Sequence, residues 1–179
     1  KYMFLKGIKD KFKRKSGRKA LKQLVTTPVA VTRENKGIRS LGCIVDLDKF
    51  ENSELFFKFQ EEFSLQPNAV KIIGYKRFYD KNSPYATPVF SDKDLGWKGE
   101  IENSYALEFL GREYDLLVNY YNEDSLLLNL MSAKTKARLK VGFKEVGPTY
   151  NDLMLDTPLK DFQLFKKELK KYLGIFKEI

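Results

Sequence analysis

Cationic side chains concentrate in the first 23 residues, where they could bind phosphate groups. The segment KYMFLKGIKDKFKRKSGRKALKQ contains ten Lys and Arg but a single acid, Asp10. The other 156 residues contain 23 basic and 23 acidic side chains, so the net charge of +9 resides in this segment. Such a block typically binds a polyanion. The side chains expected to contact RNA are Lys6, Lys9, Lys11, Lys13, Arg14, Lys15, Arg18, Lys19 and Lys22.

Apolar residues within the same segment leave two alternatives open. Leu5, Ile8 and Phe12 recur at helical spacing, which predicts a helix with an apolar face. That face could lie in an anionic membrane with lysines at the headgroups, or it could simply dock on the rest of the protein. Ser16 and Gly17 predict a kink or break in the middle of the helix. The membrane alternative is less favoured because the apolar face is short and Gly17 interrupts it.

Two acids that follow an apolar stretch, Asp46 and Asp48, could bind Mg²⁺ or act as general acid and base. Asn119 and Tyr121 end a second apolar stretch. In a parallel sheet all four side chains would lie at the edge where ligands bind. Acids after a strand more often cap the next turn, however, and the sequence has neither a GxGxxG nor a GxxxxGK(S/T) phosphate loop. A small-molecule or nucleotide-binding enzyme with this pocket is therefore a second alternative.

Histidine is absent and cysteine occurs once, which narrows the chemistry further. Without imidazole there is no Ser-His-Asp or Cys-His pair, and most zinc sites are excluded. Cys43 is expected to be a buried, unreactive thiol. We therefore expect no catalytic residue, no metal and no cofactor. No apolar run approaches the roughly 20 residues that span a bilayer, and no secretory signal follows the N-terminal charges, so a cytoplasmic location is expected.

Further cations could extend an RNA-binding surface. Lys134, Lys136 and Arg138 lie in the sequence AKTKARLK, where a helix would place Lys134 and Arg138 on one face. Lys76 and Arg77 lie in a loop from residue 75 to 97 whose aromatic side chains could stack on unpaired bases. Solvated surface and loop packing are the commoner roles of such residues, so these five are secondary candidates. The sequence has no helix-turn-helix or zinc-finger pattern, so no DNA specificity is expected.

The elements that must position these residues alternate between strands and helices. Apolar runs predict buried strands at 41–47, 69–75 and 114–121, and shorter strands near 29–31, 87–90, 98–101, 138–143 and 152–155. Apolar residues at helical spacing predict helices at about 53–63, 104–110 and 125–137, and a last helix that starts at Thr157 with Pro158 in its first turn.

This alternation predicts an α/β fold, a three-layer sandwich with a mostly parallel sheet of five or six strands in flavodoxin-like or Rossmann-like order. One of the last two strands could run antiparallel at the sheet edge, because only a short loop separates them. We divide the chain into a basic N-terminal helical arm at 1–25, a linker at 26–39 and an α/β domain at 40–179.

Three segments behind the basic helix carry a resemblance: YDLLVNYY (114–121), ARLKVGF (137–143) and NDLMLD (151–156). With them the chain resembles a family of uncharacterised bacterial proteins, a domain of unknown function, over nearly its whole length. The resemblance implies a Rossmann-like α/β body behind a basic helix. The matching segments are mostly strand cores, so the resemblance implies no active site and no substrate.

These observations favour a cytoplasmic, non-enzymatic protein that docks on structured RNA through its basic helix, for example on rRNA in a ribosomal particle. The cations would provide affinity, and the shape of the RNA would provide specificity. The first alternative is a peripheral protein that binds an anionic membrane or a protein partner through the same helix. The second is an enzyme that uses the pocket of Asp46, Asp48, Asn119 and Tyr121.

Overall fold

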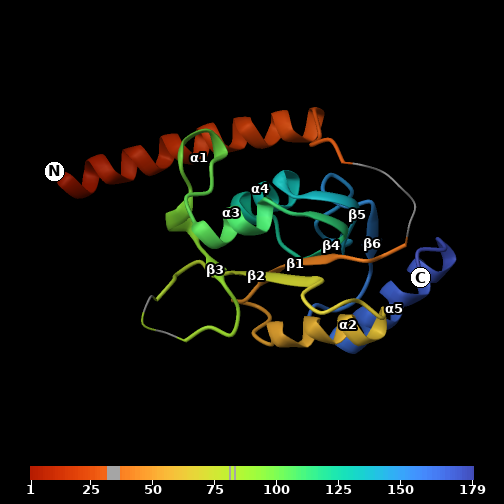
Figure 1. Cartoon of the computed structure of the whole chain (residues 1–179). Coiled ribbons are helices and arrows are strands. Elements are labelled where there is room, and N and C mark those ends of the chain that lie inside the picture. The colour runs from red at the N-terminus through yellow and green to blue at the C-terminus, as the bar shows by residue number, and fades with distance from the viewer. Residues whose placement is uncertain (32–36, 81, 83) are drawn as a thin grey trace.

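The computed structural model describes residues 1–31, 37–80, 82 and 84–179, and its core is a six-stranded parallel sheet (Figure 1). The strand order is β3-β2-β1-β4-β5-β6, and each neighbouring pair is parallel. The strands are β1 (Leu41–Asp46), β2 (Val70–Tyr75), β3 (Val89–Phe90), β4 (Glu113–Tyr120), β5 (Lys136–Phe143) and β6 (Leu153–Leu155). This architecture confirms the predicted α/β fold with a parallel sheet.

Helices cover both faces of the sheet and complete the predicted three layers. One face carries α1 (Tyr2–Thr26), α3 (Ser104–Leu110) and α4 (Leu126–Lys134) (Figure 1). The other carries α5 (Phe162–Ile175) and α2 (Phe59–Glu62), which continues the short 3-10 helix η1 (Ser53–Lys58). Neighbouring residues of β4 serve opposite cores, since Leu117 belongs to the core beneath α4 and Val118 to the core beneath α5. Burial on both faces explains why 41–45 of β1 and 116–118 of β4 are apolar runs.

The last strand runs parallel to β5, so the antiparallel strand suggested for this edge is wrong. Val141 pairs with Leu153, and Phe143 pairs with Leu155. β6 therefore lies beside only the final three residues of β5. The loop 144–152 has to return along the sheet by a short distance only, and for that reason a parallel pair forms here without a crossover helix.

The last helix begins later than predicted. α5 starts at Phe162 instead of Thr157, and Asp161 caps it by accepting a hydrogen bond from the Leu164 N–H at 3.0 Å. The Leu159 carbonyl accepts a hydrogen bond from the buried Tyr120 hydroxyl at 2.5 Å. That bond holds the segment around Pro158 against β4, outside the helix.

The segment after Lys134 is a strand, so the predicted helical arrangement of the second basic cluster is wrong. α4 ends at Lys134, where the Thr135 hydroxyl donates a hydrogen bond to the Met131 carbonyl at 2.6 Å. β5 begins at Lys136, and Lys134 and Arg138 therefore do not share a helix face. The chain leaves the helix here because the Thr135 side chain satisfies a carbonyl of the last turn.

Two of the predicted short strands are also wrong. Residues 29–31 form no strand, and Trp97–Gly99 is a short 3-10 helix, η3. Lys98 and Gly99 have φ values of 55° and 74°, which a strand does not contain. α1 ends at Thr26 as predicted, because the residue before a proline disfavours helix and Pro28 follows closely. Within the predicted linker, residues 32–36 lie outside the described residues.

Candidate nucleic-acid interface

The basic segment is one continuous helix, so the kink predicted at Gly17 is wrong. Gly17 is buried where α1 packs on α4 and on the turn at η3. A Cβ atom built on Gly17 would lie 3.5–3.8 Å from side-chain carbons of Leu95, Leu126 and Leu130. The Ser16 hydroxyl accepts a hydrogen bond from the Lys98 N–H at 3.0 Å. These contacts offset the helix penalty of glycine, which is about 1 kcal/mol relative to alanine.

Only the second half of α1 is attached to the body. Gly17 and Leu21 are its buried residues, whereas every residue from 1 to 12 is exposed. In Figure 1 the N-terminal part of α1 extends beyond the sheet and its other helices. The helix therefore has a docked half, from about residue 13 to 26, and a projecting half, from residue 2 to 12.

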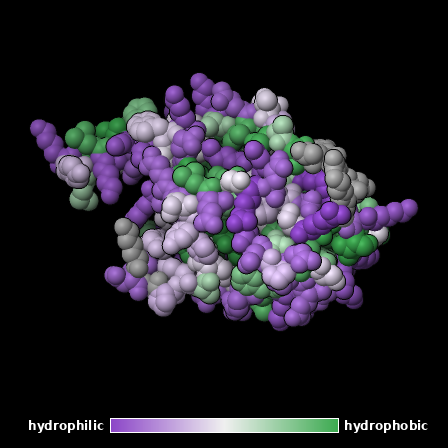
Figure 2. Space-filling model, viewed as in Figure 1, coloured by the Kyte–Doolittle hydropathy of each residue, from purple (hydrophilic) through white to green (hydrophobic). Residues whose placement is uncertain are grey.

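The projecting half carries an apolar stripe that faces away from the docking contacts. Ile8 and Phe12 lie nine residues before Gly17 and Leu21. Nine residues are two and a half helical turns of 3.6 residues, so the two pairs point in opposite directions. Phe4 is 73% exposed and Phe12 is 56% exposed. Figure 2 shows the hydrophobic surface, in green, among the polar surface of this end of the molecule.

The predicted RNA-binding cations of α1 remain free of the protein's own carboxylates, with one exception. Arg14 lies 3.8 Å from the Asp92 carboxylate, and that carboxylate also accepts a hydrogen bond from the Tyr75 hydroxyl at 2.7 Å. No other cation of α1 is in an ion pair with a described residue. The structure therefore leaves Lys6, Lys9, Lys11, Lys13, Lys15, Arg18, Lys19 and Lys22 without an acidic partner among the residues it describes.

A groove of about 580 Å³ lies between one side of the docked half of α1 and the body. Arg14, Arg18 and Lys22 lie along the helix side of this groove, with Leu21 and Val25 beside them. The body side consists of the start of α4 and the loop before β6, with Asp124, Leu126, Asn129, Thr149 and Tyr150. Three of the predicted cations thus line a concave surface rather than a fully open one.

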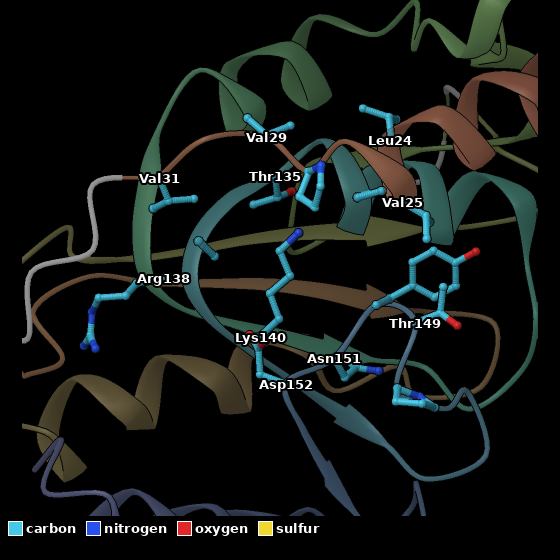
Figure 3. A pocket seen from close by; sticks show the side chains of 15 residues that line it. Leu24, Val25, Val29, Val31, Thr135, Arg138, Lys140, Thr149, Asn151 and Asp152 are labelled. Carbon is cyan, nitrogen blue, oxygen red and sulfur yellow. Dashed lines mark hydrogen bonds between the residues drawn. The ribbon is translucent and has the colours of Figure 1, made fainter.

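A second, smaller cavity of about 180 Å³ continues from this groove toward β5 (Figure 3). The two share Val25, Thr149 and Tyr150. In Figure 3 the side chain of Lys140 extends from β5 toward Thr135 and the end of α1. Its ammonium group donates a hydrogen bond to the Ser132 carbonyl at 2.5 Å. Burial lowers the pKa of Lys140 to about 8, although the nearby Asp152 charge opposes that shift.

Arg138 is a structural side chain rather than a free cation. Its guanidinium donates two hydrogen bonds to the Glu178 carboxylate, at 2.7 and 2.6 Å, and one to the Gly37 carbonyl at 3.1 Å. Asp115 lies 3.8 Å away on its other side. These partners raise the pKa of Arg138, and its hydrogen bonds lower the pKa of Glu178. Arg138 therefore ties the C-terminal segment to β5.

The other secondary cations do not gather on one surface. Lys134 lies 3.8 Å from Glu100, and the Lys136 side chain is exposed. Lys76 lies 4.0 Å from Asp48 and 5.7 Å from the centre of the Tyr85 ring, and the Arg77 side chain is exposed. The segment 76–80, which contains Lys76 and Arg77, lies on the side of the sheet away from α1 (Figure 1).

The four residues of the predicted enzyme pocket mainly contact other parts of the protein. Asp46 accepts the Asp48 N–H at 3.1 Å, and Asp48 accepts the Arg77 N–H at 2.8 Å, so both acids order turns. Burial raises the pKa of Asp46. Tyr121 donates its hydroxyl hydrogen to Asn129 at 3.0 Å. Asn119 lies in the interior of the protein and is 1% exposed.

Asn119 belongs to a buried polar network that orders the loop before β6. Its amide donates to Ser132 Oγ at 2.7 Å and to Asn151 Oδ1 at 2.9 Å, and Asn151 donates in turn to the Gly147 carbonyl at 3.3 Å. The network holds α4 and the loop together beside the two cavities. Among the described residues, no group of three or more acids and cysteines is arranged to hold a metal ion.

Sequence reasoning missed Tyr150, and it placed Lys140, the last residue of AKTKARLK, in a solvated basic cluster and missed its burial. Tyr150 lies in a loop whose position depends on the Asn119 network, and no local pattern indicates it. The burial of Lys140 could have been predicted, because Lys140 interrupts the apolar strand RLKVGF of a sheet that is covered on both faces. A lysine at such a position must reach a cavity or a polar partner, and it reaches both.

The fold places the protein in the class of parallel α/β proteins. Its distinguishing feature is a long N-terminal helix, which docks along one face of the sheet with half its length. The chain belongs to the family described as "Family of unknown function (DUF6913)", which matches residues 13–176. The match thus includes the docked half of α1 and the groove. A search of curated proteins found no match. Within the described residues, no helix is long and apolar enough to cross a membrane.

Proposed function

We propose that this protein is a non-enzymatic RNA-binding protein that docks on structured RNA, such as rRNA in a ribosomal particle, through the cationic side chains of α1. The observation that carries the proposal is that these cations, Arg14 apart, have no acidic partner among the described residues. A helix of this length extends for about 37 Å, enough to follow several phosphates of an RNA helix. The other regions of the chain have a net charge of zero, so they would add shape rather than attraction.

The location of the cations on a docked helix makes the interaction stronger than it would be on a flexible tail. Contacts at Gly17 and Ser16 hold the helix in place before any RNA arrives. Less conformational entropy is then lost on binding than if the segment were disordered. Specificity would come from the shape of the RNA, since side chains do not read bases in the deep groove of A-form RNA.

The direct test is retention of an rRNA stem-loop by the intact chain across a series of salt concentrations. The variant Lys9→Gln, Lys15→Gln, Lys19→Gln changes three exposed lysines of α1. We expect a loss of affinity of roughly tenfold or more and a log–log salt slope that is smaller by about 2 to 3, because each phosphate contact contributes about 0.7 to 0.9. The protein's thermal transition should not change.

The matched control is Lys160→Gln, Lys167→Gln, Lys177→Gln, which removes the same charge at exposed positions in or next to α5. RNA affinity should stay within about twofold of the parent chain, because α5 lies on the other face of the sheet. Equal losses of RNA affinity in the two variants would show that the affinity depends only on the net charge of the protein, and not on α1. Failure of the parent chain to bind RNA at low salt would refute the proposal.

The outward apolar stripe favours one second candidate, docking of α1 on an anionic membrane. Phe4, Leu5, Ile8 and Phe12 carry no charge for phosphates, and they are exposed on the side away from the body. Interfacial helices combine such a stripe with lysines that contact headgroups. The variant Ile8→Ser, Phe12→Ser separates the candidates. It should leave RNA retention intact, and it should abolish flotation with phosphatidylglycerol vesicles if the membrane is the partner.

A further inference from the structure

We propose that the groove between α1 and the body binds a nucleotide, with its base beside Tyr150 and its phosphate at Arg18 and Lys22. The site uses Arg18 and Lys22 of the cationic set of α1 and adds to them the apolar and aromatic lining of the groove. Where the nucleotide belongs to an RNA chain, the inference rests on the proposed function. Where it is a free nucleotide, the inference stands alone. Both sources present the same chemistry, a flat heteroaromatic ring joined to a phosphate.

The charge of the groove fits a phosphate. Arg14, Arg18 and Lys22 are spaced four residues apart and therefore share one side of α1. Arg14 is already near Asp92, whereas Arg18 and Lys22 have no acidic partner within the described part of the chain. Among the described residues, Asp124 is the one acid that lines the groove, and it accepts a hydrogen bond from the Asn129 amide at 2.6 Å. One wall of the groove is thus cationic, and two of its cations, Arg18 and Lys22, have no acidic partner among the described residues.

The remaining lining fits a base. Leu21, Val25 and Leu126 provide apolar walls, and Tyr150 provides an aromatic ring. Base rings stack on tyrosine faces regardless of sequence. The Tyr150 hydroxyl and the Thr149 hydroxyl have no hydrogen-bond partner among the described residues, so they remain available to the ligand. Burial raises the pKa of Tyr150, which keeps its hydroxyl protonated as a donor.

The size and the position of the groove support a small ligand rather than a second helix. Its volume of about 580 Å³ lies within the roughly 300–1,000 Å³ of ligand pockets. Both walls are fixed by the fold, because Gly17 packs on Leu126 and Leu130, and the Asn119 network orders the loop that carries Tyr150. A pocket with ordered walls loses little entropy on binding.

Calorimetry on the full chain tests the inference with AMP, adenosine and ribose 5-phosphate as probes, and with a five-nucleotide oligo(A) and an RNA duplex. We expect AMP to bind at least tenfold more tightly than either of its parts. Binding of oligo(A) without AMP would assign the site to unpaired RNA. Binding of neither AMP nor oligo(A) would overturn the inference. Binding of the duplex alone would overturn it too, and would leave the proposed function standing.

Four variants locate the ligand. The double variant Arg18→Gln, Lys22→Gln should weaken AMP or oligo(A) binding at least tenfold, and so should the single variant Tyr150→Leu. Tyr150→Phe should retain most of the binding because the ring face remains. The control Lys9→Gln, Lys19→Gln removes the same charge from α1 outside the groove. It should leave AMP binding unchanged and should lower duplex retention. Equal weakening by the control and the groove variant would overturn the inference, as would an unaffected Tyr150→Leu chain with an intact thermal transition.

Discussion

Two lysine-rich helices lie on opposite faces of the sheet, and they use their lysines in different ways. On α5, Lys166 and Lys170 each donate a hydrogen bond to Glu62 at 2.8 Å, and Lys171 lies 3.6 Å from Glu168. On α1, Arg14 alone has an acidic partner among the described residues. Lysine content alone therefore does not distinguish the two helices, whereas the ion pairing of those lysines does.

The apolar residues of the two helices differ in the same way. α5 buries Phe162, Phe165, Leu169 and Leu173, so its stripe runs over most of the helix. α1 buries only Gly17 and Leu21 along its 25 residues. Its other large apolar side chains, from Tyr2 to Phe12, face solvent. α5 thus belongs to the core, and α1 is attached to it only along its second half.

The largest expected effect comes from the same truncation on each helix. Phe165→Ala should lower the free energy of unfolding by about 3 to 5 kcal/mol, because the ring is fully buried between Tyr120 and Phe143. Phe12→Ala should change it by about 0.5 kcal/mol or less, since Phe12 is exposed. Urea titrations measure both. A large loss in the Phe12→Ala chain would mean that the projecting half packs on the protein in solution.

A smaller effect distinguishes the two halves of α1. Leu21→Ala should lower the free energy of unfolding by about 2 kcal/mol, at the low end for a buried leucine, because Leu21 lies at the boundary of the core. Ile8→Ala, thirteen residues earlier, should have nearly no effect. Hydrogen exchange should then show faster opening of α1 in the Leu21→Ala chain only. Unchanged exchange would show that other contacts hold the helix.

The strands and the face of α5 could be predicted from sequence because they follow from burial. A strand that is covered on both faces must be an apolar run, as in LGCIVD of β1, and a helix on a sheet must carry an apolar stripe. The spacing predicts Phe162, Phe165, Leu169, Tyr172 and Phe176 for α5, and the structure buries the first three of these together with Leu173. Helix ends were predicted less well. Thr157 and Pro158 gave a good local start signal, but the long-range bond from Tyr120 to Leu159 outweighed it.

The cationic surface could be predicted from sequence, whereas the groove could not. The positions of lysine side chains on a solvent-exposed helix follow directly from their spacing in the sequence. The groove instead requires Arg18 and Tyr150, 132 positions apart, to face each other across a gap. Their approach depends on Gly17, on the turn at η3 and on the Asn119 network. The low helix propensity of glycine predicted a break at Gly17. The local sequence does not show that the rest of the protein packs against that side of the helix.

Three glycines test how tightly α1 is held. Gly99 has a φ of +74°, and a Cβ there would lie 2.9 Å from Ala20 Cβ, so Gly99→Ala should cost about 1 to 2 kcal/mol and loosen α1. Gly17→Ala would meet only ordinary contact distances, and Gly7→Ala would meet nothing within 4 Å. Each of these two should gain about 0.5 to 1 kcal/mol from helix propensity. Destabilisation by Gly17→Ala, seen in urea titrations, would show a closer contact than the structure has.

The smallest expected effect is a pH dependence that α5 has and α1 lacks. Hydrogen bonds from Lys166 and Lys170 lower the pKa of Glu62 to about 2. The folded chain therefore keeps Glu62 ionised at a pH where the unfolded chain, with an ordinary pKa near 4.5, takes up a proton. This contribution is present above pH 4.5 and is lost as the pH falls toward 2. Its size should be about 1 kcal/mol or less, because the pair is partly exposed and salt screens it.

Urea midpoints between pH 2 and pH 6 measure this term as the difference between the parent chain and Glu62→Gln. The difference should shrink steadily toward pH 2, and high salt should reduce it at every pH. The variant Lys166→Gln, Lys170→Gln should reduce the dependence of the urea midpoint on pH in the same way. The same exchange at Lys15 and Lys19 of α1 should leave the curve unchanged, since those lysines have no carboxylate partner among the described residues. A flattened curve in that last variant would mean that the cations of α1 are paired within the protein after all, and they would then be unavailable to bind phosphates.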